Sequence, residues 1–139
     1  MNNRYLLDSW ALLAWLYKEQ PASNRIRQLL DDAADGRNHL MLSVINFGEV
    51  YYIFGRERGA NAAQKLAAAI KKLPIQILSV DEHRALTSAR YKMNDAISHA
   101  DAFAVAAAEE LDAILLTGDP ELFVLDGEIQ IERLYRTSE

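Results

Sequence analysis

The sequence has 139 residues, of which half are apolar, a quarter are charged and none is cysteine. This length fits one domain, and the composition excludes a disordered or collagen-like chain, disulfide scaffolds, thiolate zinc sites and iron–sulfur clusters. The net charge of −5 excludes nucleic-acid binding through an overall basic surface, so any such contact depends on a local site.

In the first half of the chain, short apolar runs alternate with helical patterns. Strands are expected at residues 5–7 and 39–42, and helices at residues 10–17, 22–35, 43–58 and 60–73. Ser43 is suited to cap the third of these helices, and Gly59 is suited to end it.

The second half repeats the alternation. Strands are expected at residues 75–80, 113–116 and 129–131, and helices at residues 81–93 and 98–111 with a short helical piece after residue 119. Strands that are short, continuous apolar runs are typical of a parallel sheet covered by helices on both faces. We therefore expect an α/β fold with a mainly parallel, roughly five-stranded sheet, formed by a single domain over residues 1–139.

The chain shows no targeting or membrane segment that would change this prediction. No apolar run reaches the length of about 18 residues that a membrane helix needs. The apolar run at 10–17 is followed by Lys18 and Glu19 and by no clear cleavage site, which argues against a signal peptide. We expect a cytoplasmic protein that does not associate with membranes.

Two acidic residues follow predicted strands. Asp8 ends the first strand and Asp119 ends the fourth. In open parallel sheets the functional site lies beyond the carboxyl ends of the strands, so both side chains could face one crevice. The alternative for each is a helix N-cap, and Pro120 at the next position favours that role for Asp119.

Two further acids interrupt the apolar faces of helices. Glu49 has mostly apolar or aromatic neighbours one turn away, and Asp101 lies within an alanine-rich stripe. A bare carboxylate at such a place pays a desolvation cost of several kcal/mol unless it is protonated, paired or bound to a cation. The alternatives are a boundary position that reaches water for Glu49, and a capping box with Ser98 for Asp101.

If these four acids converge, their mutual repulsion requires compensation by a cation. Mg²⁺ and Mn²⁺ bind oxygen-only sites of this kind together with phosphate oxygens, which suits phosphodiester hydrolysis. Asp8 and Asp101 are the first candidates for metal ligands, with Glu49 and Asp119 as further ones. Ser9 could orient a carboxylate or a water, as could Thr117; ordinary turn chemistry is the alternative for both hydroxyls.

Four blocks in this order resemble the PIN domain, and more narrowly the VapC-type ribonuclease toxins of prokaryotic toxin–antitoxin pairs. The blocks are YLLDS at 5–9, INFGEV at 45–50, ISHADAF at 97–103 and LLTGDP at 115–120. No single block is specific, but the four together span nearly the whole chain.

The resemblance implies a three-layer α/β/α fold and an endoribonuclease that depends on Mg²⁺ or Mn²⁺. It implies a catalytic quartet with supporting hydroxyl groups beside the first and fourth acids. The quartet falls on Asp8, Glu49, Asp101 and Asp119, and the hydroxyl groups on Ser9 and Thr117. It also implies RNA as the substrate, a homodimer, and a cognate antitoxin that holds the toxin inactive. Two nearby acids, Glu121 and Asp126, are additional candidates at the fourth position.

Other functions remain as alternatives. A PIN nuclease with a housekeeping role in RNA processing would carry the same residues, and an inactive PIN-like module would use the crevice to bind a protein. A receiver domain is disfavoured because no lysine follows the fourth strand, and a haloacid-dehalogenase-like phosphatase because Asp8 is not part of an Asp-x-Asp motif.

Overall fold

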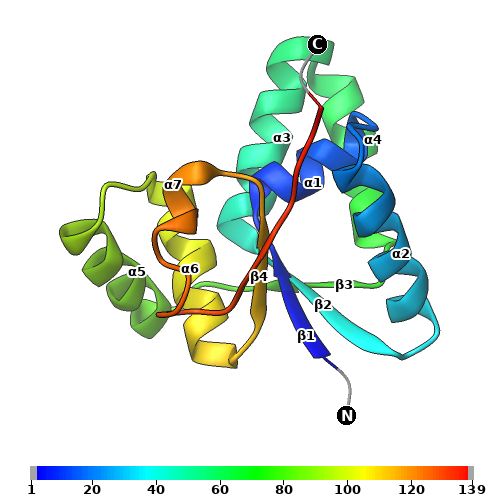
Figure 1. The fold of residues 1–139 in the computed structure, drawn as a ribbon. Helices are drawn as coiled ribbons and strands as arrows, with labels where there is room; N and C mark the ends of the chain where they lie inside the picture. Colours follow the sequence, from blue (N-terminus) through cyan, green and yellow to red (C-terminus); the bar gives the residue numbers. More distant parts are fainter. Residues whose placement is uncertain (1–2, 138–139) are drawn as a thin grey trace.

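A five-stranded parallel sheet forms the centre of the computed structural model, which describes residues 3–137 (Figure 1). The strands are β1 (Asn3–Leu7), β2 (Asn38–Ser43), β3 (Ile75–Leu78), β4 (Ile114–Thr117) and β5 (Ile131–Arg133). They lie in the order β3-β2-β1-β4-β5, and every neighbouring pair is parallel. The predicted parallel α/β fold is confirmed.

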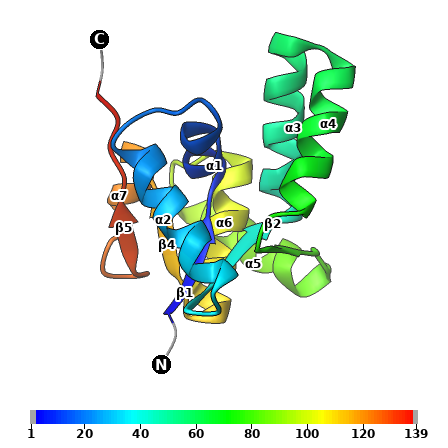
Figure 2. The same ribbon diagram turned by 90° about the vertical axis from the view of Figure 1, so that its right-hand side faces the viewer.

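Helices cover both faces of this sheet. They are α1 (Ser9–Leu16), α2 (Ala22–Ala34), α3 (Val44–Arg58), α4 (Ala60–Lys71), α5 (Glu82–Asn94), α6 (His99–Leu111) and α7 (Pro120–Phe123). Figure 1 shows α5 and α6 on one side of the sheet and α2 and α4 on the other, and Figure 2 shows α3 and α4 side by side. No helix within residues 3–137 is both long and apolar enough to cross a membrane.

The two faces of the sheet bury two separate cores, because successive side chains of a strand point to opposite faces. Leu7 of β1 packs with α1, α2 and α4, where Ile26 and Ile70 are fully buried. Leu6 packs on the other face with the alanine-rich helix α6, in which every residue from 100 to 108 is buried. Alanine keeps α6 close to the sheet, so polar side chains at its start also lie close to the strand ends.

The strands begin and end within two residues of the expected bounds. The third strand ends at Leu78 rather than at residue 80. The prediction of a last strand at 129–131 was wrong, because the strand is Ile131–Arg133. Ile129 instead belongs to a turn, in which its N–H group donates to the carbonyl of Leu125. The apolar alternation of residues 129 and 131 therefore spans a turn and a strand start.

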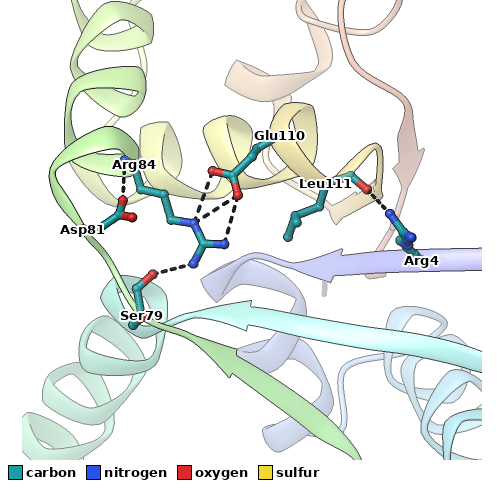
Figure 3. Close-up of polar contacts among 6 residues, drawn as sticks. All are labelled: Arg4, Ser79, Asp81, Arg84, Glu110 and Leu111. Atoms are coloured by element: carbon teal, nitrogen blue, oxygen red, sulfur yellow. Dashed lines mark hydrogen bonds and ion pairs between the residues drawn. The ribbon is translucent and has the colours of Figure 1, made fainter.

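The end of α6 far from its acidic first turn is tied to its surroundings by arginines (Figure 3). The Arg84 guanidinium pairs with Glu110 at 2.9 Å and donates to the carbonyl of Ser79 at 2.7 Å. Arg4 donates to the carbonyl of Leu111 at 3.0 Å. These contacts join α5, β1 and the segment after β3 to the last turn of α6.

Candidate functional site

The topology brings the ends of two strands and the starts of two helices to one edge of the sheet. Strand β1 is central, and Leu7 pairs with Leu116 of β4, so the residues that follow the two strands are neighbours. Helix α3 starts directly after β2 at the same edge. Helix α6 leads back into β4, so its first turn lies there too. The chain crosses from one side of β1 to the other at this point, which is where open parallel sheets place their sites.

Asp8 is fully buried at this edge. One carboxyl oxygen, Oδ1, accepts a hydrogen bond from the N–H group of Ala11 at 2.8 Å, so Asp8 is the N-cap of α1. The other oxygen, Oδ2, is buried without a hydrogen-bond partner among residues 3–137. The capping alternative is therefore correct for one oxygen only, and the second oxygen remains available for a cation.

The pKa of Asp8 is raised to about 8, chiefly because the buried carboxylate loses its hydration. The charges of Asp101 and Asp119 contribute to this rise, whereas the Thr117 hydroxyl and the Ala11 N–H group reduce it. These effects identify the neighbours of the Asp8 carboxyl, and two of them are acids that were expected to lie beside it.

Asp101 is also buried, in the first turn of α6. Its pKa is raised to about 7, first by burial and then by the carboxyl of Asp119, which acts through a hydrogen bond and through its charge. The Ser98 hydroxyl lowers the pKa of Asp101, and Glu49 adds a smaller repulsion. Ser98 also caps α6 by accepting from the Asp101 N–H group at 3.1 Å. The cap uses the backbone of Asp101, so it does not neutralise the side chain.

Asp119 is half-buried and caps α7 by accepting from the N–H group of Glu121 at 3.0 Å. Its own N–H group donates to the Thr117 hydroxyl at 3.0 Å. One oxygen each of Asp101, Asp119 and Glu121 lies within 4.8 Å of the other two, which is a spacing that could hold a metal ion. Thr117 is fully buried; its hydroxyl accepts from the Asp119 N–H group and lowers the pKa of Asp8.

Glu49 lies at the rim of this cluster. It is half-buried on α3, and its charge contributes to the pKa of Asp101, whereas it is not part of the closely spaced group. Ser9 is buried, and its hydrogen bonds join it to Asn46 rather than to a carboxylate. The structure thus gives Ser9 a role in connecting helices, which differs from the expected role of orienting a carboxylate or a water.

Within the described part of the chain, the charge of these acids is not compensated by a positive side chain. Among residues 3–137, no lysine, arginine or histidine lies within 4.0 Å of the carboxylates of Asp8, Glu49, Asp101 or Asp119. Like charges crowded into a poorly hydrated site hold protons or a cation. The arrangement can therefore bind a hard divalent cation through oxygens, and such a cation can in turn approach a phosphate.

The sequence prediction missed a close contact at the same edge. A Cβ atom added to Gly118 would overlap the indole ring of Trp10, so the ring lies directly on the backbone of that glycine. The guanidinium of Arg136 lies 5.3 Å from the centre of the Trp10 ring, and it also pairs with Glu19 at 3.1 Å. Through this stack the C-terminal segment supports the loop that carries Asp119.

Two other residues near the site were underweighted or missed. Glu121 was only an additional candidate, yet its carboxylate belongs to the closely spaced group. Asn46 was not considered, although it is fully buried and lies one turn before Glu49 on α3. A buried amide on an acid-bearing helix face is the signal that could have found it. Asp126, the other additional candidate, instead faces Arg133 at 3.7 Å.

A sequence profile of the PIN domain matches residues 5–128. None of the curated protein sequences matches this chain significantly. Solved structures with the same fold include a chain of the VapBC2 complex of Rickettsia felis, bound to a promoter DNA fragment. It is 15% identical with a TM-score of 0.72, covering 95% of this chain and 99% of that one.

Two further structures agree over similar lengths. A chain of VapBC-1 from nontypeable Haemophilus influenzae is 20% identical with a TM-score of 0.68, covering 94% of this chain and 97% of that one. VapC20 of Mycobacterium tuberculosis, described as a toxin that cleaves the sarcin–ricin loop, is 16% identical with a TM-score of 0.70. The match covers 88% of this chain and 95% of VapC20. At these identities the likeness concerns the fold.

Proposed function

This chain belongs to the PIN-domain family, and from that premise we propose that it is a single-domain endoribonuclease that requires Mg²⁺ or Mn²⁺. The observation that carries the proposal is the uncompensated acidic cluster at the carboxyl edge of the sheet. One oxygen each of Asp101, Asp119 and Glu121 lies within 4.8 Å of the others, and Asp8 presents a buried oxygen with no partner within residues 3–137.

The donor set fits a hard divalent cation. All four of these groups are carboxylates, and Mg²⁺ and Mn²⁺ prefer oxygen ligands to nitrogen or sulfur. Asp8 and Asp101 would hold the ion, with Asp119, Glu121 and Glu49 as the remaining candidate ligands. When bound, such an ion lowers the pKa of a water molecule and neutralises charge on the phosphodiester.

The chain itself supplies preorganisation. The Ala11 N–H group fixes Oδ1 of Asp8, and the Glu121 N–H group fixes Oδ1 of Asp119, so both carboxylates keep one orientation without substrate. The buried Thr117 hydroxyl supports both acids. Because these partners are already in place, little reorganisation is required when a phosphate arrives, which is the general condition for electrostatic catalysis.

We further propose that the protein is the toxin of a toxin–antitoxin pair, with a cognate antitoxin and a second copy of itself as partners in the cytoplasm. The support is that the VapBC structures described above, which share its fold over nearly their whole length, are complexes of this kind. A housekeeping PIN nuclease would share the acidic cluster. An inactive binding module is disfavoured, because it would keep costly buried acids without a use for them.

The nuclease proposal is tested with the purified chain and labelled RNA, in Mg²⁺, in Mn²⁺ and in excess chelator. We expect cleavage that requires metal and that disappears in Asp8→Asn, since the amide keeps the shape and an oxygen that can cap α1. Glu110→Gln is the matched control, because Glu110 is an acid of α6 that pairs with Arg84 far from the cluster. Cleavage that survives the chelator, or that is equal in Asp8→Asn, contradicts the proposal.

The toxin proposal is tested by growth. Expression of the chain should arrest growth of its host, Asp8→Asn should not, and co-expression of the protein encoded by the neighbouring gene should restore growth and form a stable complex with the chain. Light scattering of the free chain tests the dimer. Normal growth during expression of a chain that cleaves RNA in vitro would favour the housekeeping alternative.

A further inference from the structure

We propose that Asn46 is a positioning residue of the acidic cluster, which sets the relative placement of α1, α3 and α6 that the cation requires. This inference rests on the proposed function. Asn46 has no exposed surface and lies in the first turn of α3, one turn before Glu49.

Each contact of Asn46 is next to an acid. Its side-chain Nδ2 donates to the hydroxyl of Ser9 at 3.0 Å, and Ser9 follows Asp8. The same nitrogen donates to the carbonyl of Ala100 at 3.3 Å, and Ala100 precedes Asp101. The Ser9 hydroxyl in turn donates to the main-chain carbonyl of Asn46 at 3.4 Å. One amide thus links α1, which Asp8 caps, to α3 and α6, which carry Glu49 and Asp101.

The orientation of the amide follows from the chemistry of these partners. The carbonyl of Ala100 can only accept, so Nδ2 and not Oδ1 must face it. Oδ1 is then buried, and no donor within residues 3–137 reaches it. An unsatisfied buried acceptor is unfavourable in general, so the bridging contacts of Nδ2, and not the unpaired Oδ1, carry the inference.

Asn38 provides an internal comparison. It is also buried, its Nδ2 donates to a main-chain carbonyl, that of Leu29 at 3.2 Å, and its Oδ1 likewise has no partner among the described residues. It lies at the first residue of β2, whereas the acids gather beyond the last. The two asparagines are chemically alike, and they differ in whether they connect elements of the cluster.

The test is the affinity of the metal-free protein for Mn²⁺, measured by calorimetry in wild type, Asn46→Ala and Asn38→Ala. Both variants should melt at lower temperature than wild type, because each loses a buried amide. Only Asn46→Ala should bind Mn²⁺ more weakly, by about 10- to 100-fold, as is typical when a residue that orients metal ligands is removed. In RNA cleavage the loss should fall on kcat and leave KM nearly unchanged.

Ser9→Ala sharpens the measurement, because it removes the hydroxyl that accepts from Asn46. If the two residues act as one unit, Ser9→Ala should weaken Mn²⁺ binding in wild type and add little in the Asn46→Ala background. If Asn46→Ala does not fold, Asn46→Ser replaces it, and it should weaken Mn²⁺ binding in the same direction by a smaller factor.

The outcomes separate this inference from the proposed function. Wild-type protein that binds no Mn²⁺ overturns the metal centre itself, and Asn46 with it. Wild-type protein that binds Mn²⁺, with equal affinity in the Asn46 variant, leaves the nuclease proposal standing and overturns the role of Asn46. Equal weakening in the Asn46 and Asn38 variants also overturns it, because the loss then follows stability alone.

Discussion

The two ends of α6 place an acidic side chain in opposite electrostatic surroundings. Near its C-terminal end, Glu110 meets the guanidinium of Arg84 at 2.9 Å, and Arg84 also holds the carbonyl of Ser79 (Figure 3). In its first turn, Asp101 is more deeply buried, and its charged neighbours include the acids Asp119, Glu121 and Glu49. Helix α6 therefore carries one acid, Glu110, that pairs with an arginine, and one acid, Asp101, that forms no ion pair with a described residue.

This difference indicates what each acid is for. A paired acid connects elements, and its charge is already compensated when the chain has folded. An acid buried among other acids weakens the folded state unless protons or a cation compensate its charge. Retaining such a cluster is understandable where function needs the missing cation, since stability is commonly lower at functional sites than elsewhere.

Asp101→Asn should give the largest effect, because it removes one of the two principal ligand candidates. We expect RNA cleavage to fall by about 1,000-fold, equivalent to about 4 kcal/mol, while the metal-free protein at pH 8 becomes more stable by roughly 1–3 kcal/mol. Cleavage rates and denaturant unfolding without metal measure the two effects. A variant that loses both activity and stability would mean that Asp101 is structural.

The second prediction concerns pH. Unfolded Asp residues release their proton near pH 3.8, whereas Asp101 and Asp8 in the folded chain release theirs near pH 7 and 8. Between these values the folded state binds more protons, so the free energy of unfolding of the metal-free protein should fall as pH rises from about 4 to 8. We expect a fall of about 2 kcal/mol or more, measured by urea unfolding in chelator.

Metal should oppose this fall. Mn²⁺ binds the ionised carboxylates, so it should stabilise the protein more at pH 8 than at pH 5. At pH 8 the stabilisation should be about 2.7 kcal/mol when the Mn²⁺ concentration is 100 times the Kd at that pH. Asp101→Asn should flatten both the pH dependence and the response to metal. Stability that rises between pH 5 and 8 in chelator would contradict the crowding of these acids.

Much of this arrangement could be predicted from the sequence, because it follows from local patterns. Apolar runs identify the strands, and strand ends in a parallel sheet share an edge, so Asp8 and Asp119 were expected to be neighbours. The alanine stripe of α6 likewise indicated that Asp101 is buried. These inferences need only the spacing of apolar residues within a single strand or helix, which shows the side that the element buries.

Contacts between distant residues could not be predicted in this way. Asn46 bonds to Ser9 and Ala100, which are 37 and 54 residues away in sequence. The contact of Trp10 with Gly118 depends on the crossing of α1 over the loop after β4, and no local pattern marks it. The last strand was misplaced because Ile129 lies in a turn that its N–H group closes by donating to the carbonyl of Leu125.

Gly118→Ala tests whether the loop that carries Asp119 is tightly packed against Trp10. The added Cβ overlaps the ring of Trp10, and so either the ring or the loop bearing Asp119 must move. We expect a loss of about 1–3 kcal/mol in stability, as for overpacked sites, with a change in tryptophan fluorescence and weaker cleavage. Gly48→Ala is the control, since nothing lies within 4 Å of its new Cβ atom. It should stabilise α3 by up to about 1 kcal/mol. Equal effects of the two substitutions would contradict the close approach.

Glu110→Gln should have the smallest effect and completes the comparison along α6. The pair with Arg84 is partly exposed, with 23% and 28% of the two side chains accessible, so solvent and salt weaken it. We expect a loss of about 0.5–1 kcal/mol in stability, less at high salt, with RNA cleavage unchanged. A double-mutant cycle with Arg84→Met isolates the pair, and its coupling energy should be of the same size. If Glu110→Gln instead lowered cleavage as Asp101→Asn does, the acids at the two ends of α6 would belong to one electrostatic unit, and their separation into a structural and a functional acid would be wrong.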